Sequence, residues 1–167
     1  MSDVQETKPV PELGTKAPTF SLPDAEGITV RLSDYTERWV VVYFYPKADT
    51  PGCTTEAVEF SGATDEFEKA GAVIFGISPD PAEKLAKFRD KHGITIALLS
   101  DESRTVIEKY GAWQLKKNYG RESWGVQRST FLIEPGGKVS HVWPKVRVKG
   151  HVEAVLKTLQ EIQGERA

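Results

Sequence analysis

The sequence predicts a mixed α/β fold in which one central sheet has helices on both faces. Two apolar runs, Trp39–Tyr45 and Ala72–Ser78, have the continuous hydrophobicity of strands that are buried on both sides. Segments with helical spacing follow each of them, and such alternation favours parallel strands joined by helices. A later pair of apolar segments is joined by the turn Pro135–Lys138, which predicts an antiparallel hairpin in the same chain.

Composition limits the class of protein. A chain of 167 residues with 39% apolar and 28% charged residues is typical of one globular domain. We expect residues 1–12 to form a flexible N-terminal arm and residues 13–163 to form the single domain.

Charge and hydropathy exclude several partners. The net charge of −2 gives no reason to expect nucleic acid or an anionic membrane as a partner. No apolar run approaches the roughly 18 residues of a membrane span. The N-terminus lacks the apolar core of a signal peptide, so the cytoplasm is the expected location.

In the first half of the chain, turn residues and periodicity place each element. The turn Asp24–Gly27 separates two short apolar segments and predicts an N-terminal hairpin. After the first buried strand, apolar residues at helical spacing run to Gly71, which ends the helix. The expected elements are strands over 14–22 and 28–32, a helical turn over 33–35, a strand over 39–45, a helix over 53–70 and a strand over 72–78.

In the second half, proline and glycine mark the ends of the helices. Pro81 suits the first turn of a helix, and Gly93 and Gly111 follow two helical segments. The stretch from 112 to 127 has no clean period, and we interpret it as an irregular loop. The expected elements are helices over 81–92, 103–110 and 150–163, a strand over 94–99, and hairpin strands over 129–134 and 139–143.

The chain contains one cysteine, Cys53, which follows a buried strand and a turn rich in proline and glycine. We expect the thiol to lie at the start of a helix, where backbone N–H groups lack partners and the helix dipole is positive. Both effects favour the thiolate, which is the nucleophilic form of cysteine. Because one cysteine excludes an intramolecular disulfide, Cys53 is either a small core residue or a reactive thiol.

The residues before Cys53 favour the reactive thiol. Pro46 and Pro51 restrict the backbone of the turn. Gly52 leaves no side chain beside the sulfur, so a substrate could approach the backbone amides. Thr50 has a hydroxyl that can donate and accept. It is also a suitable N-cap for the helix, and the two roles are compatible.

The pattern Pro46-x-x-x-Thr50-x-x-Cys53 resembles the active-site motif of the peroxiredoxins. The longer run from Phe44 to Ala57 is similar to the bacterioferritin comigratory protein, or type Q, branch of that family. The resemblance covers about residues 10–162. Its further segments are Leu98–Asp101, Tyr110–Trp113, Tyr119–Gly120, Gly125–Ile133 and Val146–His151.

This resemblance implies a thioredoxin-like fold and the reduction of hydrogen peroxide or organic hydroperoxides. It assigns Cys53 as the peroxidatic cysteine, Thr50 as the hydroxyl that orients the peroxide, and Arg128 as the cation that holds the thiolate and the reacting oxygens. Pro46 would shield the site from bulk water. Glu56, one helical turn after Cys53, could brace an arginine; the alternative is a solvated position on the helix.

The reaction explains these residue types. A thiolate attacks one peroxide oxygen and the other leaves as hydroxide or alkoxide, so negative charge passes from sulfur to oxygen. Fixed donors along that path, such as Arg128, stabilise the transition state more than the ground state. The product is a sulfenic acid on Cys53.

The chain departs from many type Q proteins, which carry a resolving cysteine five residues after the first. That position is Val58 here, and no other cysteine exists. We therefore expect a one-cysteine mechanism, resolved by thioredoxin, by glutaredoxin with glutathione, or by another small thiol. A disulfide between two Cys53 residues would require two recessed sites to meet. We expect a monomer or a weak homodimer.

Two other functions stay open. A peroxide sensor or redox relay would use the same chemistry at Cys53 without turnover, and a thioredoxin-like binding or holdase module would carry an idle cysteine. The histidines are scattered without metal-ligand spacing, and no dinucleotide fingerprint is present, so we expect neither a metal nor a cofactor. The leading hypothesis is an enzyme of antioxidant defence and redox homeostasis.

Overall fold

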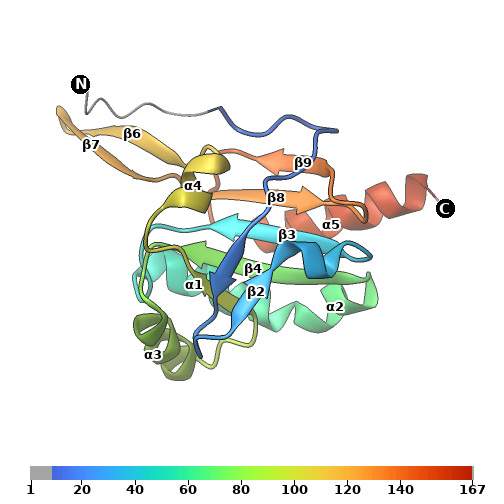
Figure 1. Cartoon of the computed structure of the whole chain (residues 1–167), viewed down its shortest axis with the longest axis horizontal. Coiled ribbons are helices and arrows are strands. Elements are labelled where there is room, and N and C mark those ends of the chain that lie inside the picture. Colours follow the sequence, from blue (N-terminus) through green and yellow to red (C-terminus); the bar gives the residue numbers. More distant parts are fainter. Residues whose placement is uncertain (1–8, 167) are drawn as a thin grey trace.

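The computed structural model describes residues 9–166, and Figure 1 shows a central sheet with helices packed against it. The sheet has five strands in the order β5-β4-β3-β8-β9. β3 (Trp39–Phe44) pairs in parallel with β4 (Ala72–Ser78), which pairs in parallel with β5 (Ala97–Ser100). β8 (Ser129–Ile133) and β9 (Val139–Trp143) are antiparallel and form the expected hairpin. The predicted mixed sheet is confirmed.

The central strand β3 contributes to two cores because its side chains alternate between the faces of the sheet. Val41 and Tyr43 belong to one core, and Val40 and Val42 belong to the other. The first core lies under α1 (Pro51–Gly62), α2 (Thr64–Lys69), α3 (Ala82–His92) and α5 (His151–Glu165). The second lies under the hairpin of β1 (Ser21–Pro23) and β2 (Thr29–Arg31), the 3₁₀ helix Leu32–Tyr35, and α4 (Thr105–Lys109). Helices therefore cover both faces, with the longer ones on the first.

The helix expected over residues 53–70 is in fact two helices. α1 begins at Pro51, two residues before Cys53, since the fixed φ of proline suits the first helical position. The chain leaves the α conformation at Ala63, which has φ −101° and ψ 4°, and α2 begins at the next residue. No proline marks this break, and the apolar periodicity continues across it, so the sequence did not reveal the break.

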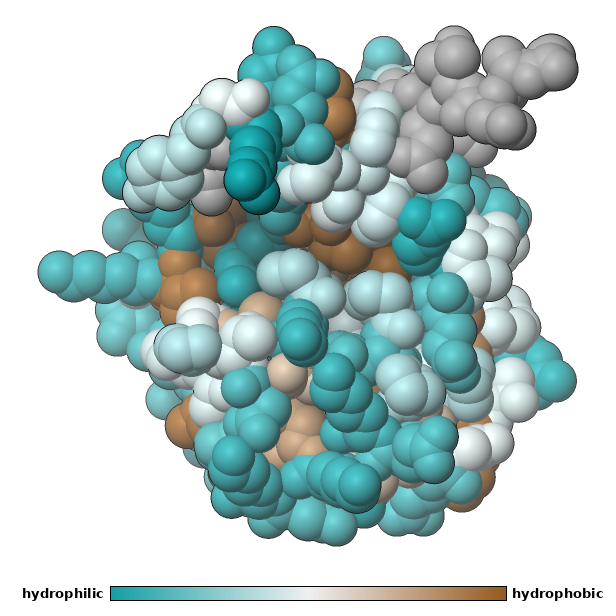
Figure 2. Space-filling view, turned by 90° about the vertical axis from the view of Figure 1, so that its left-hand side faces the viewer, coloured by the Kyte–Doolittle hydropathy of each residue, from teal (hydrophilic) through white to brown (hydrophobic). Residues whose placement is uncertain are grey.

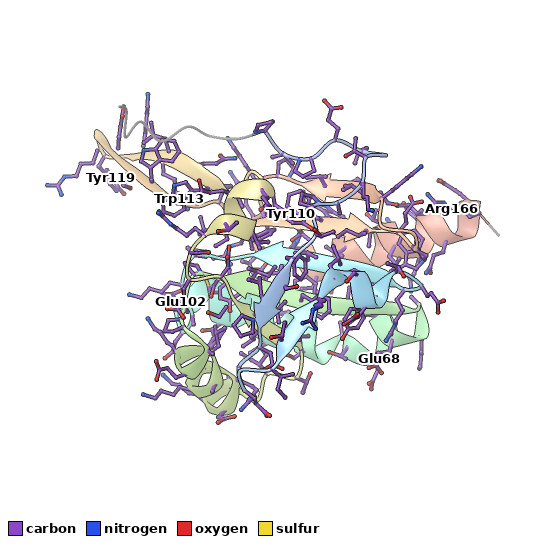
Figure 3. All side chains as sticks on the ribbon, in the orientation of Figure 1. Glu68, Glu102, Tyr110, Trp113, Tyr119 and Arg166 are labelled. Atoms are coloured by element: carbon purple, nitrogen blue, oxygen red, sulfur yellow. The ribbon has the colours of Figure 1, made fainter. Side chains whose placement is uncertain are left out.

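The prediction of an irregular loop over residues 112–127 is wrong. This segment is an antiparallel hairpin of β6 (Trp113–Asn118) and β7 (Arg121–Val126), which projects from the body in Figure 1. Its turn residues Tyr119 and Gly120 have φ of 53° and 77°, and a two-residue type I′ turn requires such positive values. Most side chains of the projecting hairpin are not buried, and Figure 3 shows Tyr119 toward its far end, so no apolar alternation revealed the hairpin.

The described part of the N-terminal segment lies against the domain. A Cβ added to Gly111 would come 2.9 Å from the carbonyl of Pro9, so glycine permits this close approach. The Gly14 N–H donates to the Val139 carbonyl. Residues 1–8 of the expected arm lie outside the described residues, and the boundary at residue 13 stays a prediction. Among residues 9–166, no helix combines the length and apolar character needed to cross a membrane.

Gly76 on β4 is required by the packing of Tyr43 on β3. A Cβ at Gly76 would lie 2.7 Å from Tyr43 Cζ and Oη, and the Tyr43 ring stacks on Phe60 with centroids 4.7 Å apart. We predict that Gly76→Ala lowers the free energy of unfolding by about 1–3 kcal/mol through overpacking, as measured by urea denaturation. Gly62 on α1 is the matched control, since a Cβ there meets nothing within 4 Å. Gly62→Ala should leave stability unchanged or raise it by up to about 1 kcal/mol. Equal losses in both variants would contradict this packing argument.

Candidate active site

Cys53 is the third residue of α1, just beyond the carboxyl end of the central strand β3. The N–H groups of this first turn have no partners within the helix, and the positive end of the helix dipole lies at the sulfur. Cys53 is only 1% exposed. The thiol therefore occupies a buried but electropositive position.

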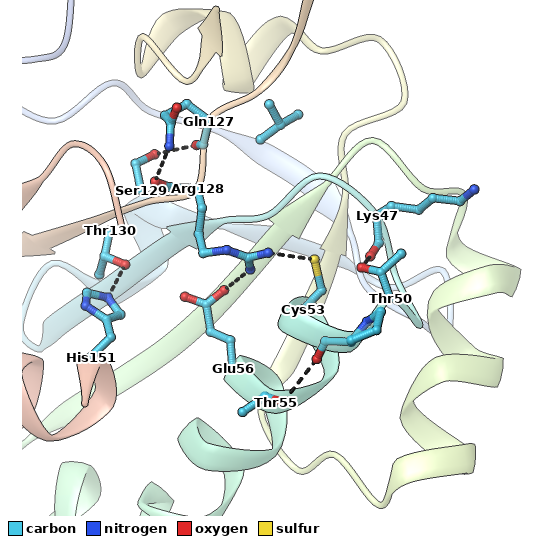
Figure 4. A network of polar contacts seen from close by, with 12 residues as sticks. Lys47, Thr50, Cys53, Thr55, Glu56, Gln127, Arg128, Ser129, Thr130 and His151 are labelled. Carbon is cyan, nitrogen blue, oxygen red and sulfur yellow. Dashed lines mark hydrogen bonds and ion pairs between the residues drawn. The ribbon is translucent and has the colours of Figure 1, made fainter. Parts of the chain in front are cut away.

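Sheet topology brings Arg128 to Cys53. β8 is antiparallel to β3, so Ser129 at its start pairs with Phe44 at the end of β3. Arg128 precedes Ser129 and reaches across to α1. Its Nη2 donates to Cys53 Sγ at 3.2 Å, and its Nη1 donates to Glu56 Oε1 at 2.6 Å (Figure 4). One guanidinium thus joins two side chains that lie one turn apart on the same helix.

Burial and charge act together on this cluster. Burial raises the pKa of Glu56 to about 7, although the neighbouring Arg128 opposes the rise. Burial also works against the charge of Arg128, but Glu56 and the Cys53 sulfur outweigh it and raise the pKa of the guanidinium. Glu56 is fully buried, and its Oε2 has no hydrogen-bond partner among the described residues. The carboxyl group therefore changes its protonation near neutral pH.

The absence of a side chain on Gly52 leaves room for the Arg128 guanidinium. A Cβ on Gly52 would lie 3.2 Å from Arg128 Nη2, closer than most Cβ contacts allow. The missing side chain therefore lets the guanidinium approach the start of α1. Pro46, which lies two residues after β3, is half-buried at the beginning of the same turn.

Thr50 occupies the N-cap position of α1 without capping through its side chain. Its carbonyl accepts from the Thr54 N–H at 2.8 Å, but its hydroxyl instead donates to the Lys47 carbonyl at 2.8 Å (Figure 4). Thr50 is therefore the N-cap of α1, as the sequence suggested, although its hydroxyl bonds back to the preceding turn and does not cap the helix. Since the hydroxyl proton is engaged, the oxygen can offer only its lone pairs to a ligand.

Sequence reasoning missed the polar network that fixes this turn. Asp80 Oδ2 accepts from the Ala48 N–H at 2.7 Å and from the Ser78 hydroxyl at 2.9 Å. Asp49 forms an ion pair with Lys91 and a hydrogen bond of 2.8 Å with His92 Nε2, both at the end of α3. One signal was available for Asp80, since it follows β4 at the sheet edge where polar groups gather in such folds.

The buried histidine His151 lies near the cluster of Cys53, Glu56 and Arg128 (Figure 4). His151 Nε2 is 2.8 Å from the Thr130 hydroxyl, and burial, followed by the charge of Arg128, lowers its pKa to about 4. His151 is therefore neutral near pH 7. Within residues 9–166, no three histidine, cysteine or carboxylate side chains converge as metal ligands would.

The fold and the site define a redox protein in which a single thiol, at the start of a helix, accepts a hydrogen bond from a partly buried arginine. Comparison with known proteins extends this description, since the AhpC/TSA family matches residues 13–142. The chain belongs to this family and is a peroxiredoxin, a thiol-dependent peroxidase.

Its relatives fall in the branch suggested by the sequence. Peroxiredoxin Bcp of Bacillus subtilis is 47% identical over 151 residues, which cover 90% of this chain and 96% of the relative. Peroxiredoxin Bcp of Escherichia coli is 44% identical over 148 residues, covering 89% and 95%.

Solved structures show the same fold. Xanthomonas campestris peroxiredoxin Q has a TM-score of 0.82 at 39% identity, covering 85% of this chain and 90% of its own. A cysteine-to-serine mutant of Xylella fastidiosa PrxQ has a TM-score of 0.88 at 33% identity, covering 93% and 99%. The fold is therefore thioredoxin-like, as the resemblance implied.

The burial of Glu56 predicts a pH-dependent stability. Its folded pKa of about 7 lies above the ordinary 4.5, so the folded state keeps a proton that the unfolded state loses as the pH rises. We predict that the free energy of unfolding of the wild type, relative to Glu56→Gln, falls by about 1–3 kcal/mol between pH 4.5 and 7.5.

Urea denaturation of both proteins across this pH range measures the difference. Glu66→Gln on the neighbouring helix α2 is the control, because Glu66 is exposed and is not among the groups that shift the pKa of Glu56. Its stability should follow that of the wild type at every pH. A constant difference between wild type and Glu56→Gln would show that Glu56 does not titrate in this range.

Proposed function

We propose that this peroxiredoxin reduces hydrogen peroxide and organic hydroperoxides through a sulfenic acid on Cys53, with Thr50 and Arg128 as its catalytic partners. The observation that carries the proposal is the 3.2 Å contact between Arg128 Nη2 and Cys53 Sγ, in a cluster that Glu56 braces. Alkyl peroxide reduction is the activity studied in ligand-bound structures of the related Xanthomonas campestris bacterioferritin comigratory protein, which supports the organic substrates.

In the first step the Cys53 thiolate attacks the nearer peroxide oxygen. An S–O bond forms and the O–O bond breaks, and its electron pair leaves on the far oxygen, which takes a proton to become water or an alcohol. Arg128 donates to the sulfur before the attack and stabilises the negative charge as it moves to oxygen. Its cationic form is favoured by Glu56, which also fixes its position.

The other residues of the turn orient the peroxide. With its proton engaged by the Lys47 carbonyl, the Thr50 hydroxyl accepts a hydrogen bond from the peroxide O–H. In Figure 4 Thr50 and Arg128 flank the sulfur, so a peroxide between them is held along the line of attack. Pro46 shields the site from water, and Gly52 leaves room for the guanidinium.

The sulfenic acid is resolved by an external thiol. Cys53 is the one cysteine of the chain, and Val58, at the position of a resolving cysteine in many type Q proteins, is 43% exposed on α1. Two Cys53 side chains, each 1% exposed, could meet only if α1 opened in both copies. Thioredoxin, glutaredoxin with glutathione, or another small thiol completes the cycle of a cytoplasmic monomer or weak homodimer that protects against oxidants.

A peroxide sensor is the second candidate, since it would use the same thiolate. The contact between Arg128 and Cys53 serves either function, so turnover distinguishes them. Steady consumption of peroxide with an added thiol supports the enzyme. Oxidation that stops after one equivalent with every reductant supports the sensor.

The roles of Cys53 and Arg128 can be tested by rapid-mixing measurements of peroxide reduction. We predict that Cys53→Ser abolishes the reaction and that Arg128→Ala raises its barrier by at least about 2–4 kcal/mol. Because Arg128→Ala leaves the Glu56 carboxyl buried without a partner, the double variant Arg128→Met/Glu56→Gln should lose as much activity while keeping the fold. Rapid reduction by the serine variant would refute the assignment of Cys53.

The role of Thr50 can be tested against a neighbouring threonine. Thr50→Val keeps the shape of the side chain but removes the acceptor, and we predict a loss of about tenfold or more in kcat/KM for peroxide. Thr55, whose hydroxyl donates to the Pro51 carbonyl at 3.0 Å, is the control at the same helix start. An equal loss in Thr55→Val would indicate a general effect on α1 rather than a contact with peroxide.

A further inference from the structure

The peptide group between Lys47 and Ala48 takes part in a hydrogen bond at each of its ends. Its N–H donates to Asp80 Oδ2 at 2.7 Å, and its carbonyl accepts from the Thr50 hydroxyl at 2.8 Å. The peptide is trans, so its N–H and its carbonyl point in opposite directions. The Asp80 carboxylate, the peptide group and the Thr50 hydroxyl therefore form one continuous series of hydrogen bonds, the Asp80–Thr50 chain.

This chain begins at a buried carboxylate that is itself firmly held. Asp80 is 7% exposed, and its Oδ2 also accepts from the Ser78 hydroxyl at 2.9 Å. Its other carboxylate oxygen, Oδ1, lies 3.5 Å from the ammonium group of Lys84. The Asp80 carbonyl accepts from the Ser100 hydroxyl at 2.6 Å, so this residue is bound to the ends of both β4 and β5. Asp80 therefore offers a fixed, negatively charged acceptor to the turn before Cys53.

The turn depends on such contacts because its backbone conformation is an uncommon one. Asp49 has a φ of 61°, in the left-handed region that residues other than glycine rarely adopt. The Asp49 carboxylate pairs with Lys91 at 2.9 Å, at the end of α3. Asp80, just before α3, holds the backbone N–H of Ala48. Two adjacent residues of the turn are thus held from outside it, and these contacts set the position of Thr50, which follows directly.

The hydrogen bonds of the Asp80–Thr50 chain strengthen one another, because each bond polarises the next group. The first bond is charge-assisted, so it makes the Lys47 carbonyl a better acceptor than an ordinary peptide carbonyl is. A better acceptor attracts the Thr50 hydroxyl proton more strongly. The Thr50 oxygen then becomes a better acceptor for the O–H of a peroxide. No proton is transferred along the chain, which acts by polarisation and by position alone.

Asp80 can influence a peroxide only through Thr50. Figure 2 views the end of the molecule at which β3 and β4 end, and the surface there is hollowed, with apolar side chains beside polar ones. A small peroxide can approach Cys53 from this end. Among the hydrogen bonds of residues 9–166, none joins Asp80 to Cys53 or to Arg128.

We propose that Asp80 is a positioning residue for the peroxide and acts through the Lys47–Ala48 peptide and the Thr50 hydroxyl. This inference rests on the proposed function, in which the Thr50 oxygen accepts the O–H of the peroxide while the Cys53 thiolate attacks. Asp80 fixes where the Thr50 oxygen lies and strengthens it as an acceptor. It thereby holds the O–O bond in line with the sulfur without touching the substrate.

A double-mutant cycle on the full-length protein tests whether Asp80 acts through Thr50. Rapid mixing measures the second-order rate constant for oxidation of Cys53 by hydrogen peroxide. Asp80→Asn keeps an acceptor for the Ala48 N–H but removes the charge, and we expect the rate constant to fall about fivefold. In the Thr50→Val background, the same substitution should change the rate constant by less than about twofold, because the last hydroxyl of the chain is missing.

Two controls separate positioning of the peroxide from a general disturbance of the fold. Asp90→Asn on α3 removes the same charge from a side chain that is 71% exposed, and it should leave the rate constant unchanged. Alkylation of Cys53 by iodoacetamide requires the thiolate but no acceptor for a substrate proton. Its rate should therefore be the same in Asp80→Asn as in the wild type, whereas a disturbed α1 would change alkylation and peroxide reduction together.

Three results would overturn the proposal. They are an unchanged rate constant in Asp80→Asn, an equal fall with and without Thr50→Val, and an equal fall in the rates of peroxide reduction and alkylation. Failure of the proposed function is seen separately, in proteins that keep Asp80. If the wild type is not oxidised at Cys53, or if Thr50→Val alone retains the wild-type rate, the proposed function has failed, and this inference fails with it.

Discussion

The ion pair between Arg128 and Glu56 is the interaction on which the rest of the site depends. Glu56 is fully buried, and the Arg128 side chain is 16% exposed, so neither charge is well solvated. Removing two charges from water is costly, and such a pair adds little net stability. Its value is geometric, since Cys53 and Glu56 lie one turn apart on α1 and hold the guanidinium at two points. The two cores on either side of β3 provide the stability that makes this arrangement tolerable.

Strand direction explains why these residues meet. Parallel strands β3 and β4 end at one edge of the sheet, and β8, which is antiparallel to β3, begins there. The turn after β3 leads to Cys53 in the first turn of α1, Arg128 is the residue before β8, and Asp80 follows β4 and binds the turn. The hairpin of β6 and β7 leads directly into β8, so it extends from the same edge (Figure 1). Residues far apart in the sequence are thus brought together by a few strand ends.

The sequence was sufficient to predict those elements whose signal lies in neighbouring residues. β4 has the bounds that its apolar run predicted. The turn before Cys53 predicted the start of α1 to within two residues. What failed depends on long-range contacts or on exposed structure. The Asp80 carboxylate meets the Ala48 N–H, 32 residues away in the sequence, only after the sheet has formed. The hairpin around Tyr119 escaped notice because tyrosine is an unusual residue at positive φ.

The burial of Cys53 has a consequence for the life of the protein in a cell. Electrophiles react with the thiolate form of cysteine, and an accessible thiolate reacts more readily than a buried one. Because only 1% of Cys53 is exposed and Arg128 lies against its sulfur, a bulky reagent reaches the thiol less readily than a small one does. Burial thus discriminates among reagents by molecular size, independently of their chemical reactivity.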